Sequence, residues 1–150
     1  MAMDFMINAW NTTLGIAEAS NVLSAIKNRN VSQGSLTLSL EERLKKILGV
    51  RHVFMTTSGS MSLLMALLSL DVSPGDEVIV PNRGWIAVIN ALLLLKAVPV
   101  IVDLHPHRPV LDVSSVKNAI TPATKGILPV HMNGCICDMN ALMNVASEHG

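Results

Sequence analysis

The stretch PGDEVIVPNRGWIAVINALLLLKAVPVIV, residues 74–102, decides the fold class. A Pro-Gly turn opens it, and the β-branched residues 78–80 predict a strand at residues 77–80 that the next proline ends. Residues 85–96 have the apolar spacing of a helix, and residues 98–102 predict a second strand. Because polar residues do not alternate along either strand, both are expected to be buried on two faces of a parallel sheet.

The rest of the chain continues this alternation of helices and strands. The further elements that we expect are strands at residues 52–56 and 126–130, and helices at residues 15–28, 39–48, 60–70, 112–120 and 138–149. Ser39 and Glu42 have the spacing of a capping box, so the second of these helices is expected to begin at Ser39. The helix at 60–70 is apolar all round and is expected to be buried on several sides. The sequence therefore predicts an α/β fold, with a mostly parallel sheet and helices on both faces.

The composition excludes several classes of protein. Half of the 150 residues are hydrophobic, 15% are charged, and eleven basic side chains balance eleven acidic ones. This apolar content excludes intrinsic disorder. The neutral total argues against a partner nucleic acid, which would need a basic patch. Polar residues and a proline interrupt the longest apolar stretch, residues 85–102, so no membrane span is expected.

The expected compartment is the cytoplasm. Residues 1–9 contain Asp4 but no Lys or Arg, which is unlike a secretory signal. The two cysteines, Cys135 and Cys137, lie too close together in sequence for an ordinary disulfide framework. Both features favour a reducing environment.

A cluster of His, Cys and Asp near the C-terminal helix has the pattern H-x3-C-x-C-D, at His131, Cys135, Cys137 and Asp138. Structural zinc sites usually show two separate Cys pairs, so no metal is expected here. His131 and Cys135 stay open as a reactive pair. His105 and His107 lie beside prolines and are interpreted as surface-loop residues.

The loop of residues 57–60 joins the expected strand at 52–56 to the apolar helix. Free N–H groups at a helix N-terminus suit a phosphate, Gly59 permits a close approach, and the hydroxyls of Ser58 and Ser60 add donors. The alternative is that one of these serines only caps the helix. The loop matches neither a Walker loop nor a dinucleotide fingerprint.

Trp85 follows the strand of residues 77–80, at the sheet edge where open α/β folds bind ligands. Its ring can stack on a flat ligand, or it can be a core or interface residue. Arg83, two positions earlier, can bind an anion or remain a solvated loop charge.

Seven stretches together resemble, in order and spacing, the DegT/StrS family of pyridoxal-phosphate (PLP)-dependent nucleotide-sugar aminotransferases: residues 48–52, 57–60, 73–81, 99–103, 119–125, 129–134 and 138–139. The resemblance runs from about Gly34 to Gly150. It implies the aspartate-aminotransferase-like fold, fold type I of the PLP-dependent transferases. Residues 34–150 would then be the N-terminal part of the PLP-binding large domain, after an N-terminal helical segment at residues 1–33.

The resemblance also implies roles for residues in two loops. Gly59 and Ser60, next to Ser58, match the family's Gly-Thr pair that binds the cofactor phosphate. Trp85 stands where the family places an aromatic residue against the PLP ring. Arg83 and Val88 depart from the family's usual residues, which bears on sugar specificity.

The family's Asp for the pyridinium nitrogen and its Schiff-base Lys come later than residue 150, and no lysine of this sequence stands in the Schiff-base context. The chain is therefore expected to hold no catalytic residue, to supply part of the cofactor cradle and to be inert alone. Its high apolar content is expected to reflect an incomplete sheet and to cause self-association.

The activity implied for the whole enzyme is transfer of an amino group, typically from glutamate, to a nucleotide-linked keto sugar in a homodimer. Two alternatives stay open. One is a PLP-dependent sugar dehydratase on the same scaffold, in which His replaces the Lys. The other is a truncated, non-catalytic protein that binds a partner.

Overall fold

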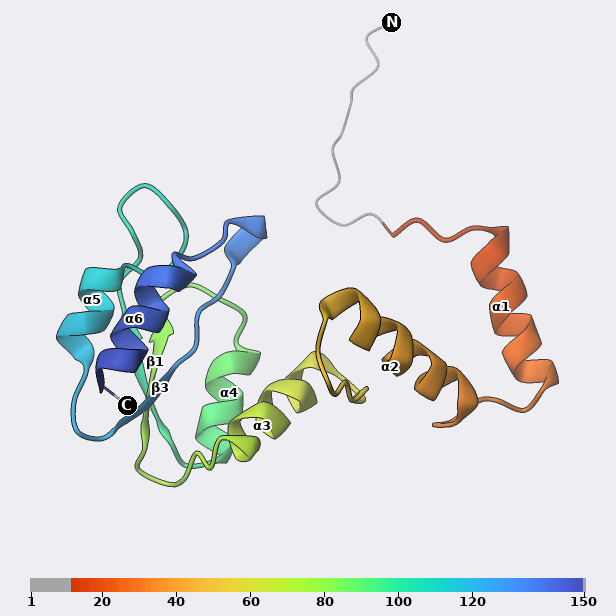
Figure 1. The fold of residues 1–150 in the computed structure, drawn as a ribbon, viewed down its shortest axis with the longest axis horizontal. Coiled ribbons are helices and arrows are strands. Elements are labelled where there is room, and N and C mark those ends of the chain that lie inside the picture. Colours follow the sequence, from red (N-terminus) through yellow and green to blue (C-terminus); the bar gives the residue numbers. More distant parts are fainter. Residues whose placement is uncertain (1–11, 150) are drawn as a thin grey trace, which may run out of the picture. The chain divides into compact units, whose positions relative to one another are not determined.

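A computed structural model describes residues 12–149 of the chain. This part divides after Met55 into two compact units, which are described separately (Figure 1). None of the helices in residues 12–149 is long and apolar enough to cross a bilayer.

The first unit contains two helices, α1 (Ile16–Lys27) and α2 (Ser35–Leu48). The N–H of Gly15 donates to a carboxylate oxygen of Glu18 at 2.7 Å, which satisfies a donor at the start of α1. This hydrogen bond is the main cause that lowers the pKa of Glu18. The apolar residues of α1 have the predicted helical spacing, yet none of them is buried.

The start of α2 differs from the prediction. The helix begins at Ser35 after Gly34, whose carbonyl accepts the N–H of Leu38 at 3.0 Å, so Ser39 lies inside the helix. The predicted capping box is therefore wrong, and Glu42 instead pairs with Lys45 at 2.6 Å. Gly49 ends the helix with a φ of 66°, in the left-handed conformation that favours glycine.

The strand predicted at residues 52–56 is also wrong. These residues pair with no strand in the described part of the chain. The N–H of Met55 donates to Oε1 of the buried Glu41 at 2.8 Å, so a side chain replaces a neighbouring strand as the acceptor.

The second unit contains a three-stranded parallel sheet in the order β2 (Val98–Val102), β1 (Glu77–Pro81), β3 (Thr124–Ile127). The first two strands are confirmed almost as predicted. β3 begins and ends earlier than the predicted range of 126–130, because pairing with β1 begins at Thr124 and shifts register after one residue.

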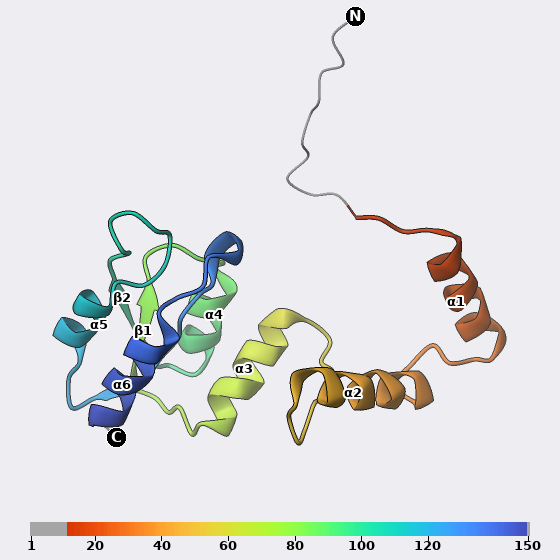
Figure 2. The same cartoon turned by 45° about the horizontal axis from the view of Figure 1, so that its top comes forward.

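Helices cover both faces of this sheet, as predicted (Figures 1 and 2). They are α3 (Gly59–Ser69), α4 (Ala87–Leu94), α5 (Val113–Ala119) and α6 (Met139–His149), with a short 3-10 helix at Met132–Gly134. Val78 and Val80 of β1 pack in one buried cluster with α3 and α4, whereas Ile79 packs in a second cluster with α5 and α6. Because side chains alternate along β1, this one strand contributes to both buried clusters.

The helix α3 is less buried than its sequence suggests. Leu67 is its only buried residue within this structure, whereas Met61, Met65 and Leu68 are exposed. The prediction of burial on several sides is therefore wrong for the described part of the chain, in which α3 buries one face against α4 and the sheet.

Candidate functional site

The loop before α3 is shaped by hydroxyl groups. The Oγ of Ser58 accepts the N–H of Met61 at 3.3 Å, and its carbonyl accepts the N–H of Ser62 at 3.0 Å. Ser58 therefore caps α3, as one of the two sequence interpretations predicts.

A second layer of contacts fixes this cap in place. The hydroxyl of Thr56 donates to the carbonyl of Ser58 at 2.9 Å and lies 2.6 Å from Oγ of Ser62. The loop is thus tied to the first turn of α3 on both sides of Ser58. This arrangement holds the first N–H groups of the helix in a fixed direction.

The N-terminus of α3 remains open to a ligand. The N–H groups of Gly59 and Ser60 have no acceptor in the described part of the chain. A Cβ built on Gly59 would meet no atom within 4 Å, so neither packing nor a positive φ requires glycine there. Two free donors and the partial positive charge of an 11-residue helix fit a phosphate group.

Trp85 lies in the connection between β1 and α4 and is 73% exposed. The interpretation of Trp85 as a core residue is therefore wrong for this structure. The indole lines a pocket of about 170 Å³ together with apolar side chains that include Val88, Ile101 and Val130. A flat apolar ring fits such a wall.

The predicted cofactor residues belong to the same edge of the sheet. The helices α3 and α4 pack side by side, and both begin on the side where β1 ends (Figures 1 and 2). Ser58, Gly59 and Ser60 stand at the start of α3, and Trp85 precedes α4. Open α/β sheets bind their ligands at this edge.

Two residues of the His and Cys cluster, His131 and Cys137, are held by hydrogen bonds with each other and with the backbone. Nδ1 of His131 accepts the N–H of Cys137 at 3.2 Å, and the buried Cys137 thiol donates to the carbonyl of Val130 at 3.4 Å. Within residues 12–149, no three His, Cys, Asp or Glu side chains gather in a way that suits a metal ion.

Residues from two separate loops lie together in the structure. His105 and His107, interpreted as surface-loop residues, line a cavity of about 600 Å³ with Arg83, Arg108 and Asp103. They are exposed, as expected. The signal in the sequence is that both loops follow predicted strands of one parallel sheet, which places them at one edge.

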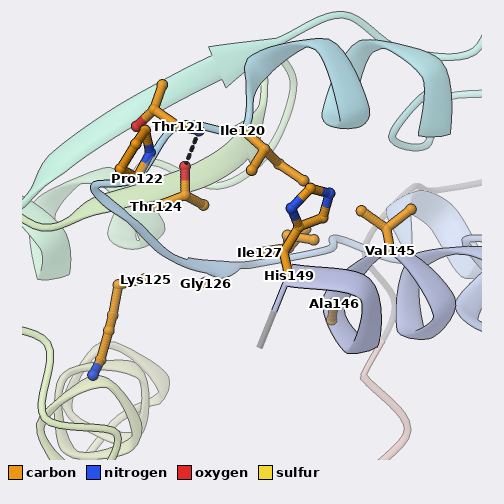
Figure 3. A pocket seen from close by; sticks show the side chains of 10 residues that line it. All are labelled: Ile120, Thr121, Pro122, Thr124, Lys125, Gly126, Ile127, Val145, Ala146 and His149. Carbon is orange, nitrogen blue, oxygen red and sulfur yellow. Dashed lines mark hydrogen bonds between the residues drawn. The ribbon is translucent and has the colours of Figure 1, made fainter.

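Another cavity, of about 420 Å³, lies where β3 begins and α6 ends (Figure 3). The side chains of His149 and Val145 face Ile120 there, whereas Lys125 points away from them (Figure 3). This cavity is at the opposite end of the strand from the predicted cofactor residues, so it belongs to a different part of the molecule.

Comparison with known proteins identifies relatives over nearly the whole chain. The model of the DegT/DnrJ/EryC1/StrS aminotransferase family matches residues 13–150. DesV of S. venezuelae, solved in complex with a ketimine intermediate, is 35% identical with a TM-score of 0.81, over 88% of this chain and 36% of DesV. NtdA of Bacillus subtilis, solved with bound PMP (pyridoxamine phosphate), is 33% identical with a TM-score of 0.85, over 91% of this chain and 32% of NtdA.

A dehydratase shares the same architecture. The E. coli GDP-4-keto-6-deoxy-D-mannose-3-dehydratase, solved with bound hydrated PLP, has a TM-score of 0.85 over 91% of this chain and 37% of its own. At 24% identity this likeness shows the fold alone. The chain spans about a third of the length of these solved structures. The predicted fold of the PLP-dependent fold type I enzymes is confirmed, and relatives solved with PMP or PLP confirm the predicted family cofactor.

Proposed function

Because the chain belongs to the DegT/DnrJ/EryC1/StrS aminotransferase family, we propose that it supplies part of the cofactor cradle of a PLP-dependent sugar aminotransferase. Residues 34–150 would form the N-terminal part of the large domain, after a helical segment at residues 1–33. The observation that carries the proposal is the open N-terminus of α3, which shares an edge of the sheet with the exposed Trp85.

Each cradle residue has a defined physical task. The N–H groups of Gly59 and Ser60 donate to the cofactor phosphate, and the hydroxyl of Ser60 adds a donor. The hydroxyl oxygen of Ser58 accepts the N–H of Met61, and this hydrogen bond positions the turn. The indole of Trp85 covers one face of the cofactor ring and excludes water from it. When bound, PLP supplies an electron sink at the substrate carbon.

The substrate, donor and assembly follow from the same proposal. A nucleotide-linked keto sugar receives an amino group, with glutamate as the donor, in a homodimer. The two cysteines are free thiols, which suits a cytoplasmic enzyme. Two observations distinguish the alternatives. A His at the position of the Schiff-base Lys would indicate sugar dehydration on the same cradle. Failure to bind PLP would indicate a non-catalytic binding protein.

The cradle is tested by PLP titration of the purified chain in a calorimeter. Replacing Ser60 by Ala removes a donor to a charged phosphate and should weaken PLP binding about tenfold. Trp85→Leu should also weaken binding, because the stacked ring loses its partner.

Matched controls lie elsewhere in the chain. Ser69→Ala removes a hydroxyl from the other end of α3, and Phe54→Leu removes another exposed aromatic ring. Both should bind PLP like the unchanged protein. A PLP affinity in the Ser60 and Trp85 variants equal to that of the unchanged protein would refute the cradle.

A further inference from the structure

We propose that the cavity between the loops after β1 and β2 binds the diphosphate of the nucleotide-linked substrate. The identity of this substrate rests on the proposed function, whereas the anion site rests on the cavity itself. Asn82, Arg83 and the loop of residues 103–109 line a space of about 600 Å³. The space is a surface hollow that is largely open to solvent, so a charged ligand could reach it.

The loop that carries most of these residues is held by its own hydrogen bonds. Leu104 and Leu111 form an isolated antiparallel bridge, and the N–H of His105 donates to the carbonyl of Val110 at 2.9 Å. Val110 and Leu111 are buried in the core on the α5 and α6 side. The loop therefore has a fixed base, so a ligand does not have to order it from a free chain.

The charges around the cavity favour an anion. Arg83 forms no hydrogen bond or ion pair with any residue between 12 and 149, so its guanidinium is free to bind a ligand. Nη2 of Arg108 donates to the carbonyl of Ile136 at 2.6 Å, which fixes that side chain while leaving other N–H groups. The imidazoles of His105 and His107 line the same cavity, where Nδ1 of His105 accepts the N–H of His107 at 3.2 Å and its Nε2 has no such contact within residues 12–149.

One carboxylate opposes these cations. Oδ1 of Asp103 accepts Nδ2 of Asn82 at 3.2 Å, and Asp103 lines the same cavity. Two guanidinium groups against one carboxylate leave a net positive site. Guanidinium groups match phosphate oxygens in shape as well as charge.

The position of Asn82 connects this cavity with the Trp85 pocket. Asn82 lines both spaces, because it stands between the end of β1 and the start of the Trp85 loop. A substrate whose sugar lies against the ring that Trp85 covers therefore has a cationic cavity next to it. A diphosphate linked to the sugar is the group whose charge fits that cavity.

The test is calorimetric titration of the chain with inorganic pyrophosphate, in low salt with a chelator. Arg83→Gln should weaken pyrophosphate binding at least tenfold, because a charge-assisted hydrogen bond is lost. Asp103→Asn should strengthen it several-fold, since it removes the opposing charge and can keep the contact with Asn82. Lys125→Gln, which makes the same charge change outside the cavity, should leave the affinity unchanged.

Three results would overturn the site. They are the absence of pyrophosphate binding, a pyrophosphate affinity in the Arg83 and Asp103 variants equal to that of the unchanged chain, and simple competition between PLP and pyrophosphate. Thermal melts of each variant exclude unfolding as the cause. A nucleoside diphosphate that binds no tighter than orthophosphate would assign the cavity to free phosphate instead. Failure of PLP to bind, with the pyrophosphate pattern intact, would reject the cradle and keep the anion site.

Discussion

Asp112 illustrates how much a single side chain does in this fold. Its Oδ2 accepts the N–H of Ser115 at 2.9 Å and the Ser115 hydroxyl at 3.0 Å, and it also accepts the Ser114 hydroxyl. The hydrogen bond from Ser114 is the largest cause that lowers the pKa of Asp112, followed by the backbone of Ser115. The helix predicted at residues 112–120 begins at this residue, which is the N-cap of α5 in the structure, and Asp is among the residues preferred at that position.

Removing the cap should weaken the second unit measurably. We expect Asp112→Ala to lower the free energy of unfolding by about 1 kcal/mol at neutral pH, whereas Asp112→Asn should change it little, since Asn also caps. Because the folded-state pKa is depressed, the stabilisation is present above the ordinary pKa and is lost as pH falls through the folded value. Urea titrations should therefore show the gap between Asp112→Ala and the unchanged chain closing in acid. A gap that widens in acid would contradict this assignment.

Helices and strands whose signals lie in neighbouring residues are predicted well from the sequence. Strands that need a partner from a distant part of the chain are not. The strands β1 and β2 are predicted because turns and prolines bound their apolar runs. The run at 52–56 has a similar composition but no partner strand within residues 12–149. The predicted start of α2 is wrong because Gly34 precedes the helix without a side-chain cap. Ser39 and Glu42, which lie inside the helix, have the spacing of a capping box and so indicate a later start.

The candidate site divides in the same way. The turn of Ser58, Gly59 and Ser60 at the start of α3 is predictable, because a hydroxyl-rich turn before an apolar run is a local signal of a helix start, whereas the binding role of these residues stays a prediction. For Arg83, His105 and Arg108 the sequence predicts only that their loops lie at one edge of the sheet. Which of these side chains meet depends on β1 and β2 being neighbours, and that pairing is seen only in the structure.

The central strand β1 should be the most sensitive element of the sheet. Ile79 is 0% exposed, so Ile79→Ala should lower the free energy of unfolding by about 2–5 kcal/mol through lost burial and a new cavity. Ile101 on β2 is 61% exposed and is the matched control, for which Ile101→Ala should change it by less than about 0.5 kcal/mol. Chemical denaturation measures both, and similar losses in the two variants would argue against β1 as the shared core strand.

Half of the residues are hydrophobic, and many large apolar side chains of residues 12–149 are exposed. Leu94 at the end of α4, Leu68 on α3 and Ile101 on β2 are exposed in the second unit. Large apolar side chains left exposed in this way are expected to contact another chain or another part of the same protein. It agrees with the expectation that the described sheet is only part of a larger one.

The purified chain should therefore self-associate. Sedimentation velocity over a range of concentrations should show species larger than the monomer, and Leu94→Lys should reduce them without lowering the melting temperature. A single monomeric species at every concentration would contradict the prediction.

The order of pairing in the sheet also has a consequence for the route by which the chain folds. Glu77 of β1 meets Val98 in one ladder and Thr124 in the other, so the pairing with β2 closes much the shorter loop. Closing the longer loop costs less than about 1 kcal/mol more in chain entropy, which affects the order of events more than the final stability. We therefore expect β1, α4 and β2 to assemble first and β3 to add to the pair of strands that they form.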